Sequence, residues 1–216
     1  MKRVTLFCGH YGSGKTNVAV NYAMHLRRQG KHTALADIDV VNPYFRSADS
    51  RRELEEQGIT VIALPFANTN VDLPALPQEV YGLVQRRDVY AVLDVGGDDR
   101  GAYALGRYVP YIREENDFAL LFVVNFYRPL TQDAESAFAV LREIELAAGL
   151  PFTGIVNNSN LGEETTAETV LRTVPLADEL AEKAGIPVRF TSVKRELADA
   201  VQRDDLFPLA LQPKLF

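Results

Sequence analysis

The most chemically specific stretch of the sequence is FCGHYGSGKTNVAV, residues 7–20, where a short apolar run breaks into glycines followed by a lysine and a threonine. It contains the pattern G-x-x-x-x-G-K-[ST], with Gly9, Gly14, Lys15 and Thr16 at the fixed positions. Glycines let successive backbone N–H groups curl around phosphate oxygens, and the N-terminus of a following helix adds partial positive charge. We therefore expect a phosphate-binding loop in which Lys15 reaches the outer phosphates and Thr16 places its hydroxyl on Mg²⁺.

The neighbours of these four residues are expected to contact the same phosphates. An ordinary glycine turn before a helix is the alternative interpretation, but the apolar strand before the loop and the helical pattern after it supply the context that the motif requires. The residues predicted to bind nucleotide from this stretch are Gly9, Gly12, Ser13, Gly14, Lys15, Thr16 and Asn17.

Phosphoryl transfer also needs a metal ion and a positioned nucleophile, so we expect carboxylates that serve these roles at the ends of other strands. Asp94 ends the apolar run YAVLD, where it can hold Mg²⁺ through water. Gly96 and Gly97 follow and form a turn that could sense the γ-phosphate. The alternative is that Asp94 caps the next helix.

A second pair of carboxylates lies in ALADIDVVNP, which contains Asp37 and Asp39. Alternation along a strand places both side chains on one face. Because Asp39 lies farther toward the rim, we predict that it positions the metal-bound or the attacking water, which makes it both a catalytic and a metal-site residue. For Asp37, a supporting role in the site and a purely structural role are equally compatible with the sequence.

The rest of the chain predicts the frame that positions these residues. Runs rich in β-branched and aromatic residues alternate with helical patterns, the clearest of which spans residues 131–148 and stops at Gly149 and Pro151. Strands that are apolar on both faces and are joined by helical crossovers indicate an α/β fold, with a mostly parallel sheet of about seven strands covered by helices on both faces. We expect residues 1–216 to form a single nucleotide-binding domain. The expected strands span residues 4–8, 32–39, 59–64, 90–95, 118–125, 152–157 and 188–193.

Composition excludes several classes of function. The net charge is -6 and acidic and basic residues are interspersed, so there is no basic stripe of the kind that gives nucleic-acid binders their affinity. Cys8 is the only cysteine, the N-terminus lacks a signal-peptide pattern, and the most apolar run, residues 118–124, is too short to cross a bilayer. Two prolines in the tail LFPLALQPKLF argue against a terminal membrane helix. We therefore expect a cytoplasmic protein without a membrane partner.

Five segments together resemble the MinD/ParA group of P-loop ATPases, which includes CobQ and CobB and is related to the nitrogenase iron protein. The segments are GHYGSGKT, ALADIDVVNP, LDVGGDD, GIVNNSN and IPVRFTSVKRELADAVQRDD. The resemblance implies a three-layer P-loop NTPase fold with Asp39 in the first switch and Asp94 as the Walker B carboxylate. It also implies that Asn157 or Asn158 contacts adenine, and that an ATP-bound homodimer drives a protein partner or an assembly step.

The chain departs from this group at one position in the loop. The group usually carries a second lysine, in K-G-G-x-G-K-[ST], that reaches across the dimer, whereas this sequence has His10 and Tyr11 where lysine and glycine are expected. A histidine is mostly neutral at pH 7 and shorter than lysine, so it is a poor substitute for a permanent charge. Arg46 and Arg100 lie beside the predicted switches, but nothing in the sequence singles out either as a replacement.

The strand end NNSN, residues 157–160, bears on the choice of nucleotide. GTPase families carry N-K-x-D there, and its aspartate accepts hydrogen bonds from guanine. Because this chain has Asn160 at the last position, the sequence favours ATP over GTP. The alternative is that these asparagines only form a turn, to which they are well suited.

The sequence thus predicts a Mg²⁺-dependent ATPase that acts as a nucleotide-driven dimerisation switch for a protein partner. Tyr44 and Phe45 lie just beyond the predicted first switch, where they either anchor that partner or pack under the next helix. Two other functions stay open. One is an ATP-dependent small-molecule kinase or ligase of the dethiobiotin synthetase type, and the other is an ATP-sensing adaptor that does not hydrolyse nucleotide.

Overall fold

The computed structural model of the 216-residue chain describes residues 1–39, 48–63, 78–97, 103 and 105–211. Its centre is one eight-stranded sheet with the order β3-β2-β4-β1-β5-β6-β7-β8, in which every pair of neighbours is parallel. The predicted α/β class, with a mostly parallel sheet between helices, is confirmed. The strands are β1 (Val4–Cys8), β2 (Thr33–Asp37), β3 (Ile59–Ala63), β4 (Tyr90–Asp94), β5 (Phe118–Val124), β6 (Gly154–Asn157), β7 (Val188–Lys194) and β8 (Leu206–Leu209).

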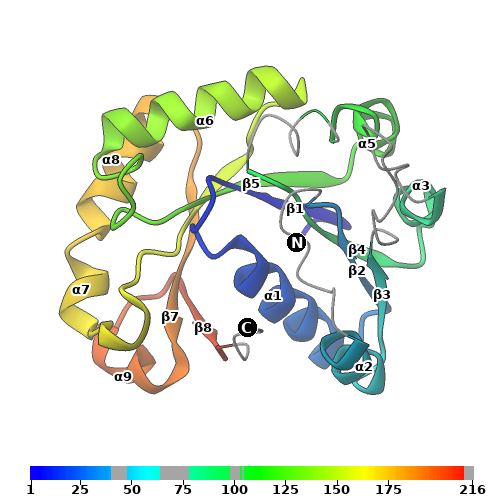
Figure 1. Cartoon of the computed structure of the whole chain (residues 1–216), viewed down its shortest axis with the longest axis horizontal. Helices are drawn as coiled ribbons and strands as arrows, with labels where there is room; N and C mark the ends of the chain where they lie inside the picture. The colour runs from blue at the N-terminus through cyan, green and yellow to red at the C-terminus, as the bar shows by residue number, and fades with distance from the viewer. Residues whose placement is uncertain (40–47, 64–77, 98–102, 104, 212–216) are drawn as a thin grey trace.

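Helices cover the sheet on both faces and produce three layers (Figure 1). One face packs against α1 and α2, and the other against α3, α5, α6 and α8, each with its own cluster of buried apolar side chains. Among the described residues, no helix is both long enough and apolar enough to span a bilayer. The helices are α1 (Lys15–Arg28), α2 (Ala48–Glu56), α3 (Gln78–Gln85), α5 (Val109–Glu115), α6 (Ala134–Ala148), α7 (Ala167–Leu171), α8 (Val174–Ala184) and α9 (Ala198–Val201), with 3₁₀ turns η2 (Gly162–Glu164) and η3 (Arg195–Leu197).

The strand β1 explains why the loop that follows it is held firmly. All five of its residues are buried, and it pairs with β4 on one side and β5 on the other. A strand of this kind must be apolar on both faces, which is what the sequence VTLFC supplies apart from one threonine. Residues 9–14 therefore emerge from the middle of the sheet, between the ends of two neighbouring strands.

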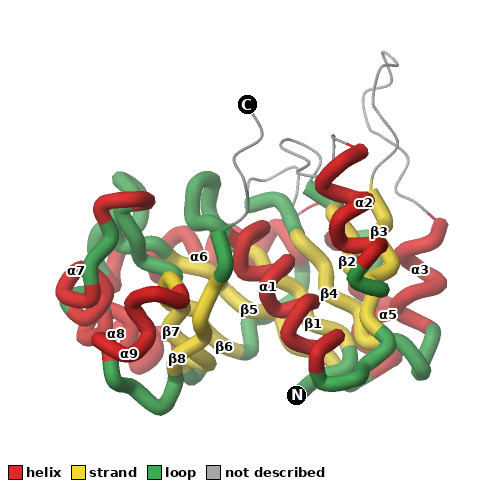
Figure 2. Tube along the Cα trace, turned by 90° about the horizontal axis from the view of Figure 1, so that it is seen from below, coloured by secondary structure: helices red, strands yellow, loops and turns green. Residues whose placement is uncertain are grey.

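The eighth strand, β8, was not among the predicted strands. The sequence pattern predicted no strand in the C-terminal tail, yet Leu206–Leu209 pairs with β7 at the edge of the sheet. Proline lacks an N–H group, and an edge strand is where this loss is tolerated because one side of the strand has no neighbour. Pro208 is exposed, and Figure 2 shows β8 beside β7.

Arg3 joins three elements on the side of the sheet away from the glycine loop. Its guanidinium donates to the carbonyl oxygens at and beyond the end of α3, and its Nε lies 2.7 Å from Oε1 of Glu115 at the end of α5. The last carbonyl groups of a helix have no partners within the helix, so Arg3 supplies hydrogen bonds that the carboxyl end of α3 would otherwise lack. The accepting carbonyls belong to Leu83, Val84, Arg86 and Val89.

We predict that Arg3→Ala lowers the free energy of unfolding by about 3–5 kcal/mol, because it removes the donor to four carbonyl oxygens and leaves Glu115, with a side chain only 10% exposed, paired with Arg87 alone at 4.0 Å. Urea denaturation followed by circular dichroism measures this. The matched control is Arg52→Ala, which removes an exposed arginine paired with Glu56 and should change the free energy by less than about 1 kcal/mol. Equal effects of the two substitutions would contradict the role assigned to Arg3.

Candidate functional site

The carboxyl ends of β1, β2, β4 and β6 meet at one rim of the sheet and bring together most of the polar residues predicted from the sequence. Asp37 and Asp94 are register partners on the neighbouring strands β2 and β4. The turn after β4 lies directly on the glycine loop, since a Cβ added to Gly97 would be 1.7 Å from the carbonyl oxygen of Gly9. Only glycine fits at this contact, so any movement of residues 96–97 is transmitted to the loop.

The glycine loop leads into α1 without a side-chain cap. Gly14 precedes the helix in the left-handed conformation, with φ 81°, and no side chain accepts a hydrogen bond from the first turn. By contrast, α6 begins with a capping box in which Asp133 accepts a hydrogen bond from the backbone N–H of Ser136. The first N–H groups of α1 are thus available to an external anion, which is the arrangement expected of a phosphate site.

Lys15, Thr16, Asp39 and Asp94 form the polar centre of the site. Nζ of Lys15 lies 3.0 Å from Oδ2 of Asp39, and the Thr16 hydroxyl donates to Oδ2 of Asp94 at 2.5 Å. Asp37 accepts from the backbone N–H of Asp39 at 3.1 Å, because β2 ends at Asp37 and the strand predicted to reach Asp39 stops two residues earlier. The exposed fractions are 7% for Lys15, 4% for Asp39 and 1% for Asp94, so the charges interact in a poorly solvated space.

These contacts shift the pKa values of the buried groups. Burial raises the pKa of Asp94 from 3.8 to about 6, against the opposing attraction of Lys15 and the hydrogen bond from Thr16. Burial by itself would lower the pKa of Lys15, but the carboxylates of Asp94 and Asp39 outweigh it and hold that pKa above its ordinary value. Lys15 therefore stays charged at neutral pH, while Asp94 is held near its titration point.

The donor set fits a magnesium ion that is shared with a nucleotide. Oδ1 of Asp94 is buried and has no hydrogen-bond partner, so it is the one carboxylate oxygen left for a ligand beside the Thr16 hydroxyl. The described residues contain no group of three or more histidine, cysteine or carboxylate side chains that could hold a metal by themselves. Mg²⁺ typically binds through one or two protein oxygens, substrate phosphates and water, which is what these residues offer.

Asn157 and Asn158, predicted to contact adenine, lie at the end of β6 in different surroundings. Asn157 is fully buried, donates to Oγ1 of Thr173 at 3.0 Å, and accepts from Ser159. Asn158 donates to the carbonyl oxygen of Ser13 at 2.7 Å and accepts from Ser192, so it braces the glycine loop. A Cβ on Gly14 would lie 2.4 Å from its Nδ2, which again requires glycine.

A cavity of about 750 Å³ extends from the start of α1 to the segment after β6 and to the carboxyl ends of β7 and β8. Asn158 lines it, whereas Asn157 lies behind it. Ser159 and Asn160 also line it and belong to the segment NNSN that the sequence placed at a strand end. Several further lining residues were not predicted as site residues, because only the fold brings them to the cavity. They are Arg128, Glu163, Ser192, Lys194, Leu209 and Leu211.

One lining residue, Asn160, occupies the place that the sequence comparison with GTPases singled out. Its Nδ2 donates to the carbonyl oxygen of Asn158 at 2.7 Å, and its Oδ1 accepts from the backbone N–H of Gly162 at 3.1 Å. The turn that the sequence allowed as an alternative is therefore formed. It holds Asn160 at the wall of the cavity.

Other predicted residues are placed less centrally. Cys8 is buried, donates to the carbonyl oxygen of Gly96 at 3.3 Å, and burial raises the pKa of its thiol to about 12, so it is an inert part of the core. Within the loop, Tyr11 is 68% exposed and the carbonyl oxygen of Tyr11 lies 3.0 Å from Nδ1 of His10. The predictions for Tyr44, Phe45, Arg46 and Arg100 fall outside the described residues.

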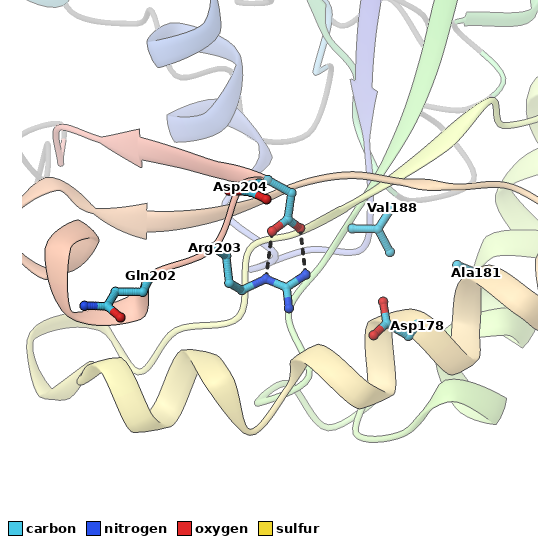
Figure 3. A pocket seen from close by; sticks show the side chains of 7 residues that line it. Asp178, Ala181, Val188, Gln202, Arg203 and Asp204 are labelled. Atoms are coloured by element: carbon cyan, nitrogen blue, oxygen red, sulfur yellow. Dashed lines mark hydrogen bonds and ion pairs between the residues drawn. The ribbon is translucent and has the colours of Figure 1, made fainter.

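A second cavity, of about 590 Å³, lies at the amino ends of β7 and β8, away from the glycine loop (Figure 3). Its arginine, Arg203, is already paired with Asp205, through Nε to Oδ1 at 2.7 Å and Nη2 to Oδ2 at 3.1 Å. Asp178 faces the same space (Figure 3). With its cation neutralised and further carboxylates around it, this cavity offers nothing for a phosphate.

Comparison with solved structures shows a P-loop NTPase-like fold that resembles the folds of signal recognition particle proteins. The chain is similar to cell division protein FtsY from Thermotoga maritima, with a TM-score of 0.57, 21% identity, and coverage of 88% of this chain and 61% of that one. It is also similar to the signal recognition particle receptor FtsY from Elizabethkingia anophelis in complex with GDP, with a TM-score of 0.51, 16% identity, and coverage of 89% and 58%.

A third similar structure is the Signal Recognition Particle 54 kDa protein from Aeropyrum pernix in complex with GDP, with a TM-score of 0.52, 16% identity, and coverage of 87% of this chain and 40% of that one. The chain thus spans less than two thirds of the length of these three proteins. No protein-family profile and no curated protein sequence matches it. At such low identity the similarity establishes the fold alone.

The raised pKa of Asp94 leads to a prediction about stability. Between pH 4 and about 6 the folded protein holds a proton that the unfolded chain releases, so the free energy of unfolding falls as pH rises through this window. Asp94→Asn removes the effect. At 1.36 kcal/mol for each pKa unit, its stability relative to the wild type should rise by about 3 kcal/mol from pH 4 to pH 7 in the absence of nucleotide and Mg²⁺.

Urea denaturation at a series of pH values measures this difference. Asp205→Asn is a control of opposite sign, because Arg203 helps hold the pKa of Asp205 below its ordinary value against the effect of burial, so that substitution should lower stability at pH 7 and lose its effect in acid. A pH-independent difference for Asp94→Asn would contradict the buried, poorly solvated site.

Proposed function

We propose that the protein is a Mg²⁺-dependent ATPase that acts as a nucleotide-driven dimerisation switch of the MinD/ParA type, for a protein partner or an assembly step. The observation that carries the proposal is the buried group of Lys15, Thr16, Asp39 and Asp94 at the uncapped start of α1. Beside it lies a cavity large enough for the rest of a nucleotide. Each of these features suits phosphate chemistry and none is needed to complete the fold.

Each residue has a distinct part in this proposal. Lys15 leaves its ion pair with Asp39 to bind the outer phosphates, and the free N–H groups of Gly14 and the first turn of α1 bind the phosphate oxygens between them. Thr16 and Asp94 hold Mg²⁺, which neutralises the charge that develops on the transferred phosphoryl group. Asp39, released from Lys15, orders the attacking water.

The cavity wall favours adenine over guanine. A guanine site needs a carboxylate that accepts from the ring N–H and the exocyclic amino group, whereas the wall here presents the amide of Asn160. Both ends of that amide are already bonded within the turn, to Asn158 and Gly162. We therefore propose ATP as the nucleotide, although two of the similar solved structures contain GDP.

Dimerisation and partner binding belong to the same proposal, through the resemblance to the MinD/ParA group. His10 stands where that group carries its second lysine, and it is only partly exposed. We propose that the ATP state brings two copies together without a lysine donated across the interface, and that Tyr44 and Phe45 contact the protein partner.

The kinase or ligase alternative receives less support. It needs a second polar pocket facing the γ-phosphate, and the 590 Å³ cavity formed by the described residues lies at the opposite ends of the strands and does not supply one. The non-hydrolysing adaptor keeps one observation in its favour, the replacement of the second lysine by His10. A measurement of ATP hydrolysis distinguishes the two, because the adaptor does not hydrolyse ATP and the ATPase does.

The first test measures mass in solution by light scattering, together with phosphate release. We expect the mass to double with Mg²⁺ and a non-hydrolysable ATP analogue but not with ADP. Lys15→Ala should abolish both the shift and Mg²⁺·ATP binding, because it removes the buried cation that meets the outer phosphates. Lys2→Ala, which removes an exposed lysine paired with Asp117, is the matched control and should behave as the wild type.

Two results of this test would contradict the proposal. One is retained Mg²⁺·ATP affinity in Lys15→Ala. The other is a mass independent of nucleotide with no phosphate release until metabolites are added, which would point to the kinase or ligase.

Asp39→Ala separates binding from turnover. Because Lys15 no longer has to break an ion pair, we expect the variant to bind ATP at least as tightly as the wild type while its hydrolysis falls by about 10²-fold or more. Titration of a fluorescent ATP analogue and single-turnover phosphate release measure the two quantities. Unchanged hydrolysis would show that a different residue orders the water.

A further inference from the structure

Arg128 lies in the segment between β5 and α6, and its side chain contacts the glycine loop. Its Nε donates to the carbonyl oxygen of Gly12 at 2.9 Å, across 116 residues of sequence. Gly12 has φ +78°, and a Cβ at that position would lie 3.5 Å from this Nε. The guanidinium therefore lies against the bare backbone of the loop.

The segment that carries Arg128 is held in place by a buried asparagine. Asn125 accepts through Oδ1 from the backbone N–H of Tyr127 at 3.0 Å and donates through Nδ2 to the carbonyl oxygen of Asn160 at 3.2 Å. Its own carbonyl oxygen accepts from the Thr131 hydroxyl at 2.7 Å and from the backbone N–H of Arg128 at 3.1 Å. These bonds fix the point from which the arginine side chain extends.

The hydroxyl of Tyr127 adds a second anchor, because it donates to the carbonyl oxygen of Thr169 on α7 at 2.8 Å. Arg128 thus starts from a backbone that is bonded to the loop after β6 and to α7. A long side chain loses less conformational entropy on binding a ligand when its base and its Nε are already fixed.

Arg128 lines the 750 Å³ cavity, together with Gly14, Thr16 and Asn17 of the loop and first helical turn. Only Nε makes a hydrogen bond, and no carboxylate among the described residues forms an ion pair with Arg128. The two terminal nitrogens carry four N–H donors in a planar fork, a geometry that matches phosphate oxygens.

We propose that Arg128 binds the phosphate chain of the nucleotide within the same protomer and supplies a second permanent positive charge beside Lys15. The inference rests on the proposed function, since it assumes a nucleotide in this cavity. It assigns to Arg128 part of the charge that His10 does not provide. Its Nε bond to Gly12 sets the guanidinium beside the phosphates before the nucleotide arrives.

The test compares Arg128→Gln and Arg128→Lys with Arg142→Gln, a control that removes an equal charge from an exposed arginine paired with Glu145. Calorimetry gives the dissociation constants of Mg²⁺·ADP and of adenosine at several salt concentrations. We expect Arg128→Gln to weaken ADP about 10- to 100-fold, as for the loss of charge-assisted hydrogen bonds. Its ADP affinity should also depend less on salt, because one charge contact is gone.

Arg128→Lys should recover part of the ADP affinity, while adenosine should bind Arg128→Gln and the wild type equally well. Wild-type ADP affinity and salt dependence in Arg128→Gln would overturn the proposal and leave Arg128 as a brace for the loop. An equal loss for ADP and adenosine would overturn it in favour of a contact with the base or ribose.

The failure of this inference can be told apart from failure of the proposed function. If Lys15→Ala loses ADP while Arg128→Gln keeps it, the nucleotide site stands and the role of Arg128 falls. If the wild type binds no nucleotide, both fall together.

Discussion

Lys15 carries its ammonium group into a space with little access to solvent, where Nζ lies 3.0 Å from Asp39 and the charge of Asp94 also acts on it. A buried ion without partners costs several kcal/mol, so this lysine requires carboxylates on neighbouring strands. The order β2-β4-β1 satisfies that requirement, because it places Asp39, just beyond the end of β2, and Asp94, at the end of β4, beside the loop that carries Lys15. The charge balance of the site therefore depends on the order of the strands in the sheet.

The same charges explain why the site suits a divalent ion. Burial is the main cause of the high pKa of Asp94, and the charge of Asp39 adds to it. One ammonium and two carboxylates also leave an excess of negative charge when all three are ionised. A proton can relieve it, and so can a cation at the unpartnered Oδ1 of Asp94. In the proposed function the relief comes from Mg²⁺ brought in with the nucleotide, whose phosphates then meet Lys15 and the uncapped start of α1.

Most of the strands and the phosphate end of the site could be predicted from the sequence, because both depend on residues that are contiguous in the chain. Apolar runs located the strands β1 to β7, and the glycine loop, Asp39 and Asp94 were assigned from short motifs at strand ends. The strand β8 was missed, since its proline is tolerated only at an edge that the sequence does not reveal. The helix predicted from residue 131 starts at Ala134, where Asp133 caps it.

The other end of the cavity could not be predicted, since its residues come from separate parts of the chain. Asn21 on α1 illustrates this, because it bonds the backbone at Ala210 and so holds the end of β8 and Leu209 at the cavity wall. The asparagines after β6 were correctly placed at the rim, but their individual environments depend on Ser13, Thr173 and Ser192, which no local pattern links to them. Arg128 was missed for the same reason.

The site therefore has two ends with different constraints. The phosphate end contains two positions that require glycine: at Gly97 a Cβ would meet the backbone of Gly9, and at Gly14 the backbone is left-handed and a Cβ would meet the side chain of Asn158. The far end is lined by side chains from the segments after β5 and β6 and from the carboxyl ends of β7 and β8, where Asn125 is hydrogen-bonded to the backbone of Asn160. A fold shared at 16–21% identity with FtsY and the 54 kDa protein is compatible with this division. In the proposed function, the backbone supplies the place for the phosphates, and a few side chains at the other end determine which base accompanies them.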